Sequence, residues 1–202
     1  MDVDSTLITQ EVIELLADHA GVRAEVEAIT LAAMRGEVDF GASLAARVAM
    51  LKGLPVSVFA QVAPQLELTP GARELVAEVQ SHGWHVGLVS GGFEELVAGL
   101  AAPLHITMFR ANRLEVADGV LTGRTTGPVI DRAAKAATLR DFARQVGASL
   151  ADTVAVGDGA NDLDMLATAG LGVAFNAKPA VRQAADASVS GRLDAVLELL
   201  EL

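Results

Sequence analysis

The chain has 202 residues, of which 51% are hydrophobic, and a formal net charge of −11. This length suits one domain or one domain with an insertion, and the acidic balance argues against a general nucleic-acid surface. Cysteine is absent, which excludes disulfides and thiolate metal sites, and the sequence predicts neither a membrane span nor a signal peptide. We therefore expect a cytoplasmic protein whose partners include no nucleic acid and no membrane.

The N-terminal third of the chain has a helical hydrophobic pattern. Residues 1–8 are predicted to be the end of a strand that runs into a loop. From residue 11 to 68, apolar residues recur at helical spacing, and glycine and proline divide this block into four helices. Because the block follows the first predicted strand directly, we expect it to form a cap over the carboxyl end of that strand.

The rest of the chain alternates between helices and short apolar strands. Strands are expected at 85–89, 106–109, 153–156 and 172–175, and helices at 73–81, 94–101, 133–146, 162–169 and 193–200. Asp118-Gly119 predicts a hairpin between 114–116 and 120–122. The alternation predicts an α/β fold with a Rossmann-like, mostly parallel sheet. Residues 1–10 and 69–202 would form this core, and 11–68 the inserted helical cap.

Two acidic stretches at opposite ends of the chain suit phosphate chemistry. They are Asp2-Val3-Asp4 and the segment from Gly157 to Asp162, which contains Asp158 and Asn161. If both follow parallel strands of one sheet, they meet at its carboxyl edge. Of the pair Asp2 and Asp4, one carboxylate could attack phosphorus while the other protonates the leaving alkoxide and later activates water. Asp2, a backbone carbonyl near Asp4, and Asp158 could supply oxygen ligands to Mg²⁺.

Two further side chains suit the phosphate itself. Ser90 follows the predicted strand 85–89 and precedes Gly91-Gly92, so its hydroxyl and the backbone N–H groups of the next helix could bind an anion. Lys135 is the only lysine between Lys52 and Lys178, and alanines surround it. A lysine in that position can act as a point charge on a phosphate oxygen.

Taken in order, these motifs resemble those of a known family. Asp-x-Asp-x-Thr, Ser-Gly-Gly, an isolated lysine and Gly-Asp-Gly-x-Asn-Asp are similar to the motif set of the haloacid dehalogenase (HAD) superfamily of phosphatases. Within it, the whole chain resembles the phosphoserine phosphatase family, including cap positions Glu11, Phe40, Arg47 and the turn at 33–36. The resemblance implies Mg²⁺-dependent hydrolysis of L-phosphoserine to L-serine and phosphate, the last step of serine biosynthesis, through a phosphoaspartyl intermediate.

The resemblance also implies a role for each core motif. Asp2 would be the nucleophile and Asp4 the general acid and base. Lys135 would be a third catalytic residue, and together with Ser90 it would hold the phosphoryl group. The implied metal-site residues are Asp2, Asp4, Asp158 and Asp162.

Other residues would contact the substrate. Glu11 would face its ammonium group and Arg47 its carboxylate, a pairing that arginine can make bidentate. Met34 and Phe40 would close over the substrate and exclude water. The Gly91 backbone and Asn161 would line the site.

The sequence departs from the family at its start, because only Met1 precedes Asp2. Family members carry an apolar strand there, so we expect this strand to be missing, shortened or provided by residues outside this sequence. An N-terminal regulatory domain and a homodimer are further expectations. Three alternatives stay open: transfer of the phosphoryl group to an alcohol such as homoserine, hydrolysis of another small phosphate ester, and a non-catalytic module that only binds a phosphorylated ligand.

Overall fold

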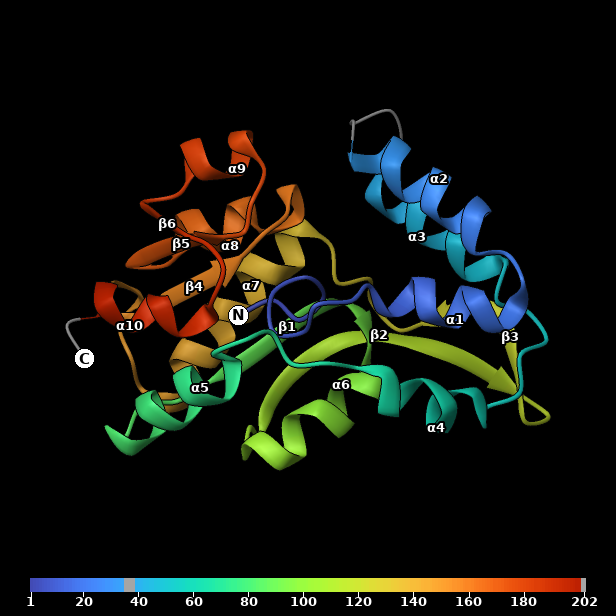
Figure 1. Cartoon of the computed structure of the whole chain (residues 1–202), viewed down its shortest axis with the longest axis horizontal. Coiled ribbons are helices and arrows are strands. Elements are labelled where there is room, and N and C mark those ends of the chain that lie inside the picture. Colours follow the sequence, from blue (N-terminus) through green and yellow to red (C-terminus); the bar gives the residue numbers. More distant parts are fainter. Residues whose placement is uncertain (35–38, 201–202) are drawn as a thin grey trace.

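The computed structural model describes residues 1–34 and 39–200, and the side chains of all of these except Ala33 and Met34. The described part has an α/β fold with mostly parallel strands, as the sequence predicts (Figure 1). Strands β4 (Val154–Gly157), β5 (Leu171–Phe175) and β6 (Ala187–Val189) form one parallel sheet. Strand β1 (Gly87–Phe93) is parallel to β2 (Met108–Ala117), which pairs antiparallel with β3 (Val120–Thr126).

The first two residues join these two sheets. The Met1 ammonium donates a hydrogen bond to the Gly87 carbonyl (2.6 Å), and the Val89 N–H donates to the Met1 carbonyl (3.0 Å). On the other side, the Asp2 N–H donates to the Val156 carbonyl of β4 (2.9 Å). These residues therefore lie between β1 and β4, and Figure 1 shows the N-terminus at this central position.

A cavity of about 670 Å³ lies next to Met1, with Gly87 of β1 and Val154 of β4 among its lining residues. Burial at this point lowers the pKa of the Met1 ammonium to about 6.

Six helices of the described chain flank these strands. They are α5 (Ala72–Ser81), α6 (Glu94–Ala101), α7 (Arg132–Val146), α8 (Leu163–Thr168), α9 (Pro179–Ala184) and α10 (Val196–Leu199). Helix α6 has the predicted bounds, and α5 and α7 begin one residue earlier than predicted. The sequence does not predict helix α9 and strand β6, because the short alanine-rich stretch 179–189 has no sustained hydrophobic period. Short 3-10 turns occur at 63–65, 102–104, 150–152, 160–162 and 193–195.

The N-terminal block contains helices α1 (Val12–Ala20), α2 (Arg23–Met34), α3 (Phe40–Ala49) and α4 (Val58–Val62). Helix α1 ends at Gly21, whose left-handed backbone (φ 70°) lets its N–H reach the Ala17 and Asp18 carbonyls. Helix α3 begins at Asp39, whose side chain accepts from the Ala42 N–H (3.1 Å). The part of this block that the structure describes is therefore helical, as the sequence predicts.

The β2–β3 hairpin supports this helical block. Its turn at Asp118-Gly119 is the predicted one, but both strands are longer, and the two predicted extended pieces 106–109 and 114–116 largely merge into the single strand β2. The N–H of Leu121 donates to the Leu54 carbonyl and the N–H of Gly53 to the Leu121 carbonyl, both at 2.8 Å. The hairpin thus extends from the sheet to the segment that follows α3, beneath α1 in Figure 1.

Helix α8 packs very closely on β5. A Cβ atom at Gly172 would lie 2.6 Å from the Leu166 carbonyl oxygen. We expect Gly172→Ala to lower the free energy of unfolding by about 1–3 kcal/mol in urea denaturation, because the contact is with backbone. Gly99→Ala is the matched control, since Gly99 lies in helix α6 and a Cβ atom there would meet nothing within 4 Å. That change should raise stability by up to about 1 kcal/mol, and equal effects of the two substitutions would contradict the account.

Candidate active site

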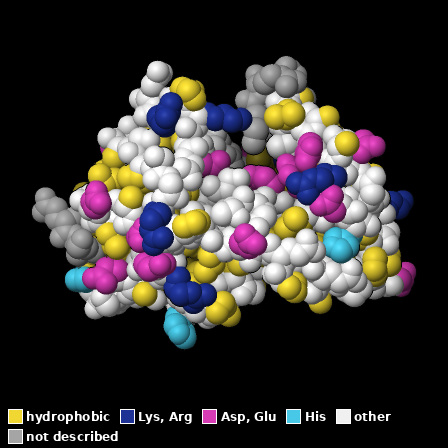
Figure 2. All heavy atoms as spheres, viewed as in Figure 1, with side chains coloured by type: hydrophobic (Ala, Val, Ile, Leu, Met, Phe, Trp, Pro, Cys, Tyr) yellow, Lys and Arg dark blue, Asp and Glu magenta, His cyan; other side chains and the backbone are white. Residues whose placement is uncertain are grey.

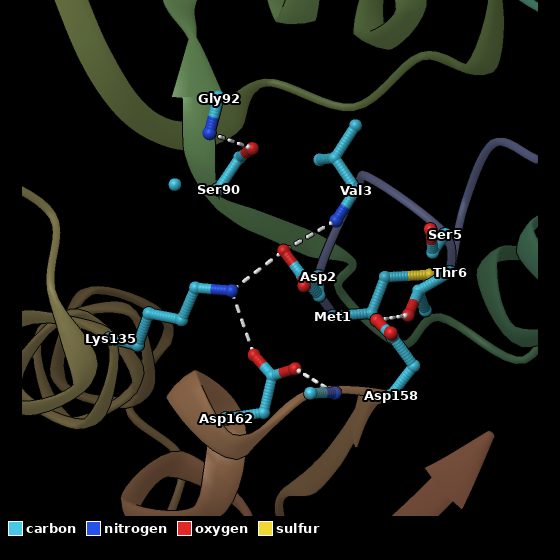
Figure 3. Close-up of polar contacts among 12 residues, drawn as sticks. Met1, Asp2, Val3, Ser5, Thr6, Ser90, Gly92, Lys135, Asp158 and Asp162 are labelled. Atoms are coloured by element: carbon cyan, nitrogen blue, oxygen red, sulfur yellow. Dashed lines mark hydrogen bonds and ion pairs between the residues drawn. The ribbon is translucent and has the colours of Figure 1, made fainter. Parts of the chain in front are cut away.

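A buried lysine joins the two acidic stretches. The Lys135 ammonium lies 2.7 Å from Asp2 Oδ1 and 2.7 Å from Asp162 Oδ1, and Lys135 and Asp162 are fully buried (Figure 3). The three side chains come from the N-terminal segment, helix α7 and the turn after β4. Burial alone would lower the pKa of Lys135, but the charges of Asp2 and Asp162 raise it above its usual range. The lysine therefore stays charged and holds two distant parts of the chain together.

Local sequence explains how each partner is positioned. Helix α7 begins at Asp131, whose carboxylate accepts from the Ala134 N–H (2.8 Å). At the end of β4, a Cβ atom at Gly157 would lie 2.5 Å from the Asp162 carboxyl carbon, so only glycine fits there. The Gly159 N–H donates to Asp162 Oδ2 (3.0 Å) and fixes the second oxygen of that carboxylate.

Three carboxylates could hold a metal ion. Ligand oxygens of Asp2, Asp158 and Asp162 all lie within 4.8 Å of one another, and Thr6 Oγ1 donates to Asp158 Oδ1 (3.1 Å). Burial, and then the charge of Asp162, raises the pKa of Asp2 to about 8 and that of Asp158 to about 6. A concentration of negative charge only partly balanced by Lys135 suits a divalent cation with oxygen ligands. The Asp4 carboxylate is not among the three.

Asp4 instead lies beside Ser90 and Gly92. The Gly92 N–H donates to Ser90 Oγ (2.8 Å), and a Cβ atom at Gly92 would lie 2.9 Å from Asp4 Oδ2. Asp4 Oδ1 is buried and has no hydrogen-bond partner among the described residues. Burial, and then the charge of Glu11, raises the pKa of Asp4 well above its usual range. Without a ligand, this carboxyl group therefore favours its protonated form.

Ser90 lies within β1, although the sequence places it after the strand. The strand register passes from Val89 opposite Arg110 to Phe93 opposite Asn112, so residues 90–92 lie opposite the single residue 111. This bulge turns the Ser90-Gly91-Gly92 segment away from regular pairing. Strand β1 can then continue to Phe93 while Ser90 lies close to Asp4.

Arg47 and Glu11 are the predicted substrate residues of the cap, and their charges act on each other and on Asp4. Arg47 is 8% exposed; burial lowers the pKa of its guanidinium, and the carboxylates of Glu11 and Asp4 oppose that shift. In the described part of the chain, Arg47 forms no ion pair. Glu11 accepts a hydrogen bond from Ser5 Oγ (2.6 Å). A guanidinium and a carboxylate that form no ion pair with each other suit a ligand that carries both charges.

Phe40 and Asn161 border the Ser90-Gly91-Gly92 segment. A Cβ atom at Gly91 would lie 3.3 Å from Phe40 Cζ and 4.0 Å from Asn161 Nδ2. The structure therefore brings Phe40, Gly91 and Asn161 together. Met34 ends helix α2, and its side chain lies outside the described residues. Figure 2 shows a hollow between the two upper lobes of the molecule, with acidic side chains at its floor.

Two residues that position the site, Asn112 and Thr6, are not among the site residues that the sequence predicts. Asn112 is buried, and its side chain donates to the Gly91 carbonyl (2.8 Å) and accepts from the Ile130 N–H (2.8 Å). It links the bulge in β1 to the segment that leads into α7, and no local signal marks it. Thr6 stands within the Asp-x-Asp-x-Thr motif, so that motif could have indicated its bond to Asp158.

The Lys135 ammonium should also matter for stability. We expect Lys135→Met to lower the free energy of unfolding by about 3–5 kcal/mol without divalent cations, since it leaves buried carboxylates without their counter-charge. Urea denaturation of the variant and the parent chain measures this difference. Lys52→Met, at an exposed lysine, is the control and should cause no measurable loss. A Lys135 variant as stable as the control would show that the buried ion pairs do not hold the site together.

The chain is similar to several known proteins. A family model described as haloacid dehalogenase-like hydrolase matches residues 1–167. Phosphoserine phosphatase SerB2 of Mycobacterium tuberculosis is 57% identical over 98% of this chain and 49% of its own length. The phosphoserine phosphatase of Streptomyces coelicolor is 57% identical over 99% of this chain and 49% of its own length. The chain therefore spans about half the length of these two relatives. The phosphoserine phosphatase of Streptococcus thermophilus is 51% identical over 100% of this chain and 94% of its own length.

Solved structures give the same result. One described as a phospho-aspartyl intermediate analogue of phosphoserine phosphatase has a TM-score of 0.93 at 42% identity, covering 98% of this chain and 95% of that one. A substrate-bound phosphoserine phosphatase complex also has a TM-score of 0.93, at 41% identity with the same coverage. With motifs, fold and near full-length similarity in agreement, the chain belongs to the haloacid dehalogenase-like hydrolase family.

Proposed function

We propose that the chain is a Mg²⁺-dependent phosphomonoesterase that hydrolyses L-phosphoserine to L-serine and phosphate. The observation that carries this proposal is the pair of carboxyl groups of Asp2 and Asp4. Asp2 is buried and bonded to Lys135 at 2.7 Å, and Asp4 lies beside Ser90 with its buried Oδ1 unpartnered among the described residues. The similarity to proteins named phosphoserine phosphatase, one of them solved as a phospho-aspartyl intermediate analogue, supports it.

In the first step, an oxygen of the Asp2 carboxylate attacks phosphorus in line with the ester bond. The bond between phosphorus and the serine oxygen breaks, and the electron pair leaves with that oxygen. Lys135 and the Ser90 hydroxyl hold the phosphoryl oxygens during this transfer. Splitting one displacement into two through a covalent aspartyl phosphate is a general way to lower a barrier.

Asp4 would move the protons. Its carboxyl group, with a raised pKa, donates a proton to the leaving serine oxygen and becomes a carboxylate. In the second step that carboxylate takes a proton from water, which attacks phosphorus. The bond from phosphorus to Asp2 breaks, and phosphate leaves. A positioned acid and base of this kind contributes a rate factor of about 10²–10⁴.

The residues present fit Mg²⁺. The carboxylates of Asp2, Asp158 and Asp162 would hold the ion, together with the backbone near Asp4, and Asn161 would support this shell. When bound, the ion would offset the negative charge that gathers on the phosphoryl oxygens. The donor set contains only oxygen atoms, which is what this cation prefers.

The helical block 11–68 would serve as the cap that selects the substrate over the core 1–10 and 69–202. Glu11 would receive the substrate ammonium group and Arg47 its carboxylate. Phe40, next to Gly91, would close over the bound substrate together with Met34. The cytoplasmic location, the homodimer and the N-terminal regulatory domain expected from the sequence stay predictions.

Substitution of the two carboxyl groups tests the reaction class. We expect Asp2→Asn to lower kcat for phosphate release from L-phosphoserine by about a thousandfold or more, since an amide cannot form the covalent bond. Asp4→Asn should lower kcat by about 10²–10⁴. Asp118→Asn in the hairpin turn is the control and should retain the parent rate. Near-normal activity of the Asp2 variant would rule Asp2 out as nucleophile.

Substitution in the cap tests the substrate. Glu11→Gln and Arg47→Met should each raise the KM for L-phosphoserine by about tenfold or more, because each removes a charged partner of the ligand. With phosphoethanolamine, which lacks the carboxylate, Arg47→Met should leave KM unchanged. An equal rise for both esters would exclude the carboxylate contact. Faster turnover of L-phosphoserine on addition of homoserine would instead favour the transferase alternative.

A further inference from the structure

Two nitrogen atoms of the Arg47 guanidinium are held by hydrogen bonds to α2 and α3. Its Nε donates to the Ser43 carbonyl (3.2 Å), and its Nη1 donates to Thr30 Oγ1 (3.3 Å). Among the described residues, Nη2 has no hydrogen-bond partner. A buried arginine that is held at two nitrogens and unpaired at the third can donate to an anion with little further ordering.

Thr30 is oriented by its own helix. Its hydroxyl donates to the Val26 carbonyl (3.0 Å), so its proton is already used and its oxygen acts as an acceptor toward Arg47. Thr30 is buried on α2, whereas Arg47 is on α3. The Thr30 hydroxyl on α2 therefore fixes the orientation of the Arg47 guanidinium on α3.

Ser43 supplies a second, independent observation. It is fully buried, and its Oγ has no hydrogen-bond partner among the described residues. An unpaired buried hydroxyl carries a desolvation cost that a ligand contact would relieve. Phe40, Ser43 and Arg47 stand at spacings of three and four, so they share one face of α3. On that face, Phe40 lies against Gly91 in the site.

We propose that Thr30 and Ser43 complete, with Arg47, a subsite for the carboxylate of an α-amino acid ligand. Thr30 is a positioning residue for the guanidinium, and the Ser43 hydroxyl donates to the ligand carboxylate. Ser90 and Lys135 already provide for the phosphoryl group, and the charge of Glu11 near Arg47 suits the ligand ammonium. This inference rests on the proposed function and adds two residues that determine its specificity.

The test measures binding of L-serine by calorimetry, alongside thermal unfolding, for the parent chain and four variants. Thr30→Val removes the hydroxyl at nearly constant shape, Thr30→Ser keeps it, and Ser43→Ala removes the unpaired hydroxyl. Thr168→Val is the matched control, because Thr168 also donates to the carbonyl four residues earlier (2.7 Å) and accepts from an arginine, Arg140 (3.0 Å), outside the site.

We expect Thr30→Val to weaken L-serine binding about tenfold and Ser43→Ala about fivefold, as for loss of a hydrogen bond to a charged or polar group. Thr30→Ser and Thr168→Val should bind L-serine like the parent chain. Ser43→Ala should not lower the melting temperature, since no protein hydrogen bond is lost. If Ser43 had only a structural role, Ser43→Ala would lower the melting temperature together with the affinity for L-serine.

Parent-like binding by both Thr30→Val and Ser43→Ala would overturn the proposal, as would loss of binding in Thr168→Val or no L-serine binding by the parent chain. Phosphate release from L-phosphoserine by the parent chain is measured separately. If release is absent while L-serine binding shows the expected pattern, the proposed reaction fails and the carboxylate subsite stands.

Discussion

The buried contact of Lys135 with Asp2 and Asp162 is the interaction on which the rest of the site depends. Its two bonds of 2.7 Å connect the first residues of the chain, helix α7 and the turn after β4. Burying such groups is costly unless each charge finds a partner. The arrangement therefore requires Gly157, which leaves space for Asp162, and the backbone bonds that hold Met1 and Asp2 between β1 and β4. Each of these features places Asp2 at one defined point of the sheet.

The unpaired polar groups around this contact differ in kind. Toward the sheet, the site offers carboxylates and the partnerless Asp4 Oδ1. Toward α3, it offers Nη2 of Arg47 and the Ser43 hydroxyl, neither of which has a hydrogen-bond partner among the described residues. A small phosphate ester that carries both an ammonium and a carboxylate group would satisfy both sides at once. The free-energy cost of leaving these groups unpaired would be relieved when such a ligand binds.

The sequence predicted the elements with a strong local period, such as helix α6, and the grouping of Asp2, Lys135 and Asp162, whose chemistry is specific. It did not predict features set by partners distant in the chain. Met1 and Asp2, in the segment predicted to end a strand, bond to β1 on one side and to β4 on the other, and no local pattern identifies these two neighbours. Ser90 belongs to β1 only through a bulge opposite β2, and Asn112 matters because it bridges Gly91 and Ile130. Hydrophobic periodicity carries no information about such contacts.

The most direct test of the account is to trap the covalent step. The chain would be mixed with L-phosphoserine and Mg²⁺, quenched in acid within the first turnover, digested, and its peptides weighed by mass spectrometry. The account predicts that one phosphoryl group appears on the peptide that contains Asp2, that hydroxylamine removes it, and that Asp2→Asn abolishes it. Turnover of L-phosphoserine without any phosphorylated Asp2 peptide, or with the phosphoryl group on another residue, would contradict the central claim.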